Sequence, residues 1–102
     1  PSPATVPPEP IPVQLLDADG AEVRAIAPDL LGSAPARLAD SGRPPREVRD
    51  WSGPWPVRQR WWGAGSAAGP EVVVRVQVVL ADGAALLLAH RGSGWWVTGV
   101  YD

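Results

Sequence analysis

Tryptophan and arginine are concentrated in residues 51–62 of this chain, which read WSGPWPVRQRWW. This stretch holds four of the six tryptophans, and the other two form the pair Trp95-Trp96. Trp and Arg are the residue types most enriched in binding hot spots, and both also stack on nucleobases. Residues 51–62 are therefore suited to binding a partner, either a protein or a single-stranded nucleic acid.

The tryptophans are also needed for the core, because the chain contains no Phe or Met. A buried tryptophan contributes on the order of 200 Å², and half or more of the six are expected to serve this purpose. Strand alternation sends the two rings of an adjacent pair to opposite faces. We therefore expect Trp61 and Trp95 in the core, and Trp62 or Trp96 facing outward. The residues predicted to bind a partner are Trp55, Arg58, Arg60, Trp62 and Trp96.

Catalytic and metal-binding chemistry has few candidates. The only histidine, His90, lies at the end of a predicted strand, where we expect it to be solvated, and one His without Cys cannot form a usual zinc site. Asp17, Asp19 and Glu22 resemble the start of a calcium loop, but Pro28 stands where that loop requires a Glu. A turn whose Asp side chains bond their own backbone is the expected structure. We predict no enzyme activity, no metal and no cofactor.

Length and composition indicate one small domain after a linker. A chain of 102 residues holds one domain at most. Prolines at positions 1, 3, 7, 8, 10 and 12 predict a disordered linker over residues 1–12, with the folded domain spanning 13–102. Because the chain begins with Pro rather than Met, we expect it to be the tail of a longer protein. These 102 residues contain no arginine-flanked apolar run of signal-peptide type and no apolar run near the roughly 20 residues of a membrane-spanning helix, so we expect a cytoplasmic protein.

Charge is spread unevenly along the chain. The net charge is −2, but residues 1–42 hold six acids against two arginines, and residues 63–102 hold three against two. Residues 43–62 hold five arginines against two acids, a local charge of +3. Dedicated nucleic-acid domains are usually clearly basic, so the balance opposes strong DNA binding and leaves room for a weak contact through residues 43–62.

Short extended segments dominate the first part of the chain. Val13–Leu16 and Glu22–Ile26, joined by an Asp-Gly turn, predict a first hairpin. Residues 36–39 fit a short strand or one helical turn, and we expect the strand. A strand over 47–51 is predicted to end at the Ser-Gly-Pro sequence that follows it, and an extended run resumes over 57–62, with Val57 on the core side together with Trp61.

The last part of the chain predicts a three-stranded meander. Residues 71–80 form the strongest strand, because β-branched valines at 72, 73, 74, 76 and 78 favour extended structure. Turns at 81–83 and 91–94 separate it from strands over 84–90 and 95–101. The whole chain is therefore expected to be all-β, a small barrel or two-layer sheet of about six or seven short antiparallel strands, with no helix longer than two turns.

Three segments carry a resemblance to a known family. They are WSGPWPVRQRWW at 51–62, VQVVLADG at 76–83 with the leucines at 86–88, and the ending WWVTGVYD at 95–102. Together they resemble the extreme C-terminal domain of the ImuB family, the inactive Y-family polymerase-like proteins of bacterial mutagenesis cassettes. The likeness covers residues 13–102 and is densest over 47–62 and 71–102.

This resemblance implies a non-catalytic adaptor in damage-induced (SOS) translesion synthesis, associated with the nucleoid during the damage response. Its C-terminal region would recruit a RecA-like accessory protein, an error-prone C-family DNA polymerase, or both. ImuB proteins also bind the sliding clamp through a short peptide of the Gln-x-x-Leu type, which this chain lacks, so clamp binding is not expected here. The resemblance gives no catalytic residues for this domain.

Two other functions stay open at this level. One is a weak contact with single-stranded DNA through the Arg and Trp face, as in barrels of the oligonucleotide-binding type. The other is a structural cap that stabilises the preceding domain of the parent protein.

Overall fold

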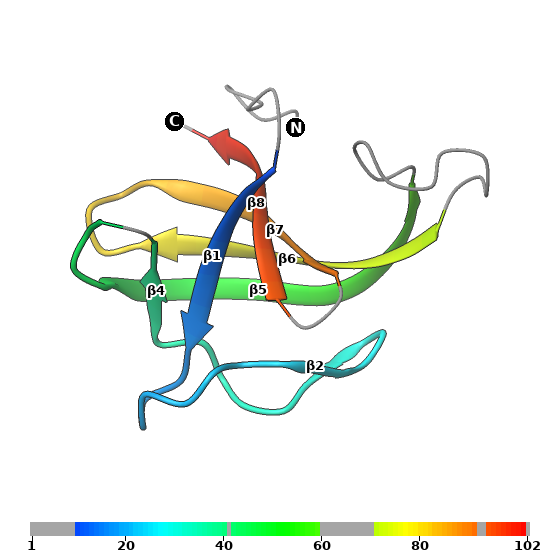
Figure 1. Cartoon of the computed structure of the whole chain (residues 1–102), viewed down its shortest axis with the longest axis horizontal. Helices are drawn as coiled ribbons and strands as arrows, with labels where there is room; N and C mark the ends of the chain where they lie inside the picture. Colours follow the sequence, from blue (N-terminus) through cyan, green and yellow to red (C-terminus); the bar gives the residue numbers. More distant parts are fainter. Residues whose placement is uncertain (1–9, 41, 60–70, 92–93, 102) are drawn as a thin grey trace.

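Strands alone make up the regular structure of the described residues, which are 10–40, 42–59, 71–91 and 94–101 of the computed structural model (Figure 1). Six strands close into an antiparallel barrel in the order β1-β4-β5-β6-β7-β8, and β2 and β3 form a separate two-stranded sheet. Of the two architectures predicted, the barrel is the one that forms. The strands are β1 Ile11–Leu16, β2 Ala25–Ala27, β3 Leu30–Leu31, β4 Arg37–Ala39, β5 Arg46–Gln59, β6 Glu71–Leu80, β7 Ala85–Arg91 and β8 Gly94–Tyr101.

The barrel has an up-and-down topology, because each of its strands pairs with the next one along the chain once β2 and β3 are set aside. Strand β1 closes it by dividing its pairing between two neighbours. Residues 11–13 pair with β8, and residues 14–16 pair with β4. An oligonucleotide-binding fold is a five-stranded Greek-key barrel, so this strand order is a different one.

The barrel interior holds the main core. On each strand alternate residues point inward, and seven of these side chains are almost fully buried, with Trp95 the largest. The indole Nε1 of Trp95 donates a hydrogen bond to the backbone oxygen of Val23 at 2.7 Å. The prediction that Trp95 belongs to the core is confirmed, since it is 1% exposed, and its neighbour on the inner face, Val97, is 5% exposed.

The predicted first hairpin forms only in part. Its turn is present: the carboxylate Oδ1 of Asp17 accepts hydrogen bonds from the backbone N–H groups of Asp19 and Ala21 at 2.9 and 3.0 Å. The predicted second strand is wrong in extent: Leu16 and Glu22 form an isolated bridge, and the end of the predicted strand belongs to β2, which pairs with β3 and not with β1. The fully buried Val23 donates its backbone N–H to the oxygen of Leu15 in β1 at 2.7 Å and accepts the hydrogen bond from Trp95. The chain leaves β1 after this residue.

The segments around β4 and β5 differ from expectation in one respect. The short strand β4 is confirmed. Strand β5 does not end at Ser52-Gly53-Pro54; it runs through that sequence without interruption. The register passes from Ser52 opposite Gln77 to Trp55 opposite Arg75, so β5 advances three residues while β6 advances two. Residues 52–54 therefore form a β-bulge in a continuous strand.

The C-terminal meander is confirmed. Strand β6 has the predicted bounds, and β6, β7 and β8 follow as consecutive antiparallel hairpins. Strand β1 begins at Ile11, so Ile11 and Pro12, predicted as linker, belong to the barrel. Residues 1–9 of the predicted linker lie outside the described residues, as do residues 60–70 between β5 and β6. The described residues include no helix with the length and apolar character to cross a membrane.

Candidate protein-interaction surface

The bulge in β5 decides which way Trp55 points. Trp51 and Trp55 are four residues apart and would share one face of a regular strand. Trp51 packs against the barrel core. Because the bulge adds one residue before Trp55, the side chain of Trp55 moves to the outer face of the barrel.

Gly53 makes this bulge possible. Its φ is +109°, a region that side-chain-bearing residues rarely adopt. A Cβ at this position would also lie 2.7 Å from the ring of Trp55 and 2.9 Å from the backbone oxygen of Arg75. The indole of Trp55 therefore lies directly over the backbone of Gly53, in space that glycine alone leaves free.

On the outer face, Trp55 belongs to a row of side chains that crosses five strands. Residues directly opposite each other in paired strands point to the same face, and here the pairings are consecutive. We call this set the outer row: Trp55 of β5, Arg75 of β6, Ala89 of β7, Trp96 of β8 and Pro12 of β1. With strands about 4.8 Å apart, the two tryptophans lie about 14 Å from each other along the row.

The outer row rests on a small hydrophobic cluster of its own. Val73 and Ala89 are 1% and 0% exposed, and the partly buried ring of Trp96 packs against them. The Nε1 of Trp96 donates a long hydrogen bond to the backbone oxygen of Arg91 at 3.5 Å. Trp55 and Trp96 are thus half-buried rings that are held in place and still keep surface for a partner.

Arg75 supplies the charge at the centre of the row. It lies opposite Trp55 on one side and Ala89 on the other, and it is half-buried. Burial lowers the pKa of its guanidinium from the ordinary value, and the nearby Tyr101 opposes this shift. A partly desolvated guanidinium in the same row as two tryptophans gains more from a partner's acceptor groups than a fully solvated one would.

The structure separates the residues predicted to bind a partner. Trp55 and Trp96 lie together in the outer row. Arg58 does not, because it is opposite Val72 on the other face of β5, where both side chains are exposed. Arg60 and Trp62, together with Trp61, lie outside the described residues.

The predicted core position of Val57 is wrong. Val57 lies opposite Val73 on the outer face because the bulge shifts every later residue of β5 by one position. The sequence also missed Arg75, Ala89 and Pro12 as members of the surface. Only the registers of four strand pairs bring them into line with Trp55, and no local pattern carries that information.

Among the described residues, no three His, Cys, Asp or Glu side chains gather as metal ligands would. Comparison with known proteins finds no matching family model, no matching curated protein and no matching solved structure. The likeness to ImuB proteins therefore rests on the three sequence segments alone.

Proposed function

We propose that this chain is a non-catalytic protein-interaction domain and that the outer row is its docking surface. The observation that carries the proposal is the bulge at Gly53, which turns Trp55 out of the core and into line with Arg75 and Trp96. A tryptophan that served only for packing would need no such rearrangement. Clustered Trp and Arg side chains that are partly desolvated are the usual centre of a protein interface.

A protein partner fits this surface better than a nucleic acid does. Arg75 is the one cationic member of the outer row, and Ala89 and Pro12 are apolar. Binding to single-stranded DNA combines stacking rings with a groove of several cations that follow the phosphates. The net charge of −2 opposes such a groove.

The partner that we propose follows from the resemblance to ImuB proteins. The domain would belong to a translesion-synthesis adaptor and would recruit the RecA-like accessory protein, the error-prone C-family polymerase of the same cassette, or both.

A comparison of two β5 variants tests the surface. Trp55→Ala removes an outer-row ring, whereas Arg58→Ala removes an exposed side chain from the opposite face of the same strand. Each variant is titrated against the purified accessory protein and against the polymerase. Loss of a hot-spot residue costs about 2 kcal/mol or more, so we expect Trp55→Ala to weaken binding about thirtyfold. Arg58→Ala should bind within about twofold of the wild type.

Three results would count against the proposal. If Arg58→Ala abolishes binding and Trp55→Ala does not, the interface is on the other face. If neither protein binds the wild-type domain, the assignment to a translesion adaptor fails. If an oligothymidine binds and its affinity falls steeply with salt, the nucleic-acid alternative replaces the proposal. Urea unfolding midpoints of both variants close to that of the wild type show that the comparison reports on binding.

A further inference from the structure

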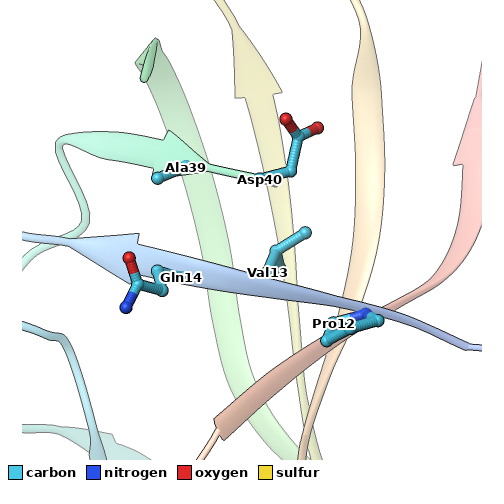
Figure 2. A pocket seen from close by; sticks show the side chains of 5 residues that line it. All are labelled: Pro12, Val13, Gln14, Ala39 and Asp40. Atoms are coloured by element: carbon cyan, nitrogen blue, oxygen red, sulfur yellow. The ribbon is translucent and has the colours of Figure 1, made fainter. Parts of the chain in front are cut away.

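A hollow of about 430 Å³ opens on the barrel where β1 separates from β4. The two strands pair only from Gln14 to Leu16, so Ile11–Val13 and Asp40 border an unpaired gap. An adjoining hollow of about 330 Å³ shares Pro12, Val13 and Asp40 with it. Figure 2 shows that the side chains of Val13 and Asp40 point to the same side of their strands and that Gln14 points away.

The floor of this hollow is aliphatic. It reaches core side chains of four strands, among them Val13, Leu38 and Val97, each below 9% exposed. At its mouth Ile11 is 49% exposed, although it lies opposite the buried Val97. A large apolar side chain exposed beside an apolar hollow favours an apolar occupant. A volume of about 430 Å³ is within the usual range for a small binding pocket.

Asp40 contributes to the lining of the hollow an acceptor that has no hydrogen-bond donor. Its Oδ1 is buried and accepts no hydrogen bond. Its Oδ2 lies 3.8 Å from the guanidinium of Arg46, which is also 3.6 Å from Asp82. A buried acceptor without a donor costs on the order of 1–3 kcal/mol, and a ligand that brings an N–H group to Oδ1 would recover that free energy.

Arg43 provides the opposite charge at the rim. It lines the hollow and is exposed. Among the described residues the ion pairs within 4.0 Å involve Arg24 and Arg46 but not Arg43. The hollow therefore presents an aliphatic floor, one acceptor that lacks a donor, and one arginine that lacks an acid.

We propose that this hollow binds a short peptide segment of a partner protein in which an aliphatic residue is followed by an acidic one. The aliphatic side chain would occupy the floor, its own N–H would donate to Asp40 Oδ1, and the acidic side chain would pair with Arg43. A free fatty acid has the aliphatic and anionic parts but no donor for Asp40. The hollow meets the outer row at Pro12, but none of the residues replaced in the test below belongs to the outer row, so either site can fail without the other.

Titration of the ¹⁵N-labelled 102-residue chain with blocked tetrapeptides tests the site. The reference probe is acetyl-Gly-Leu-Asp-Gly-amide. We expect it to shift the amide signals of Ile11, Val13 and Arg43. Methylation of the leucine nitrogen removes the donor and should weaken binding about tenfold or more. Replacement of the aspartate by asparagine removes an exposed ion pair and should weaken it about two- to fivefold.

Two matched variants test whether Arg43 is the residue that pairs with the acidic side chain of the peptide. Arg43→Gln should remove the preference for the Leu-Asp peptide over the Leu-Asn peptide, and Arg49→Gln, which alters an exposed arginine outside the hollow, should keep it. The proposal fails if the reference peptide shifts no signal around the hollow, if the N-methyl peptide binds equally well, or if Arg43→Gln keeps the preference. Ile11→Ser should also weaken the reference peptide, and an unchanged affinity contradicts the aliphatic part of the proposal.

Discussion

At the residue scale, the half-buried His90 contacts the buried ring of Trp95. They lie opposite each other in β7 and β8, with ring centroids 4.8 Å apart and an interplanar angle of 70°, an edge-to-face arrangement. The Nε2 of His90 is buried and has no hydrogen-bond partner. The prediction of a solvated strand end is therefore wrong, because it took account of the neighbouring glycine turn but not of the tryptophan on the adjacent strand.

This environment makes the stability of the domain depend on pH. Burial lowers the pKa of His90 below its ordinary value, Arg24 lowers it further, and Glu22 partly opposes them. Above pH about 6.5 the imidazole is neutral in both states; as pH falls below that value the unfolded chain takes up the proton first, so the free energy of unfolding decreases. His90→Gln should remove this part of the pH dependence.

Urea denaturation at about pH 7.5 and about pH 5.0 measures the effect as a difference between wild type and His90→Gln. The carboxylates titrate in both proteins, so their contribution cancels in the comparison. The wild type should lose more stability than the variant on acidification. Equal losses would show that His90 protonates as easily in the folded state as in the unfolded chain.

At the scale of elements, the bulge of β5 is the feature that the sequence alone does not predict. Gly53-Pro54 predicts an interruption, and for an isolated segment that prediction is sound. The strand continues because β6 pairs with β5 on both sides of the bulge, from Leu80 opposite Val48 to Glu71 opposite Gln59. Alternation within the Trp95-Trp96 pair was predictable from that pair alone. The outward turn of Trp55 was not, since it depends on the register of a second strand.

Two glycine variants isolate what the bulge contributes. Gly83 and Gly53 both have positive φ, at +94° and +109°, but a Cβ on Gly83 would meet nothing within 4 Å. Gly83→Ala should cost only the backbone term, about 1–2 kcal/mol. Gly53→Ala adds overlap with Trp55 and with Arg75 O, typically a further 1–3 kcal/mol or so.

Urea unfolding measures the difference in the free energy of unfolding between the two variants, and the affinity for the partner protein is a second measurement. Because Trp55 must move to make room, Gly53→Ala should also weaken binding through the outer row, whereas Gly83→Ala should not. Equal stability losses together with unchanged binding would show that the ring of Trp55 does not depend on the bare backbone beneath it.

At the scale of the whole molecule, the barrel combines long ladders between consecutive strands with short ladders that close it. Strands β5 to β8 pair through extended ladders between chain neighbours, and such local pairings are the ones that the sequence predicts. Closure depends on three pairs from β1 to β8, three from β1 to β4 and two from β4 to β5. The partner of Val13 is Trp95, far along the chain, and no local pattern specifies such a pair. For this reason the sequence alone does not distinguish a barrel from a two-layer sheet.

The seam between β1 and β8 should control the cooperativity of the whole barrel. Removal of residues 1–9 leaves every described pairing of β1 in place, so the melting temperature should stay within a few degrees of the wild type. Removal of residues 1–13 deletes the seam, including Val13, which is 8% exposed and lies against Trp95. Burial of one such side chain is worth about 1.5–3 kcal/mol, so the melting temperature should fall by roughly 10 °C or more. Tryptophan fluorescence should shift to longer wavelength as Trp95 meets water. If both truncations melt with the wild type, β5 to β8 hold the core without closure, and β1 serves only to line the hollow.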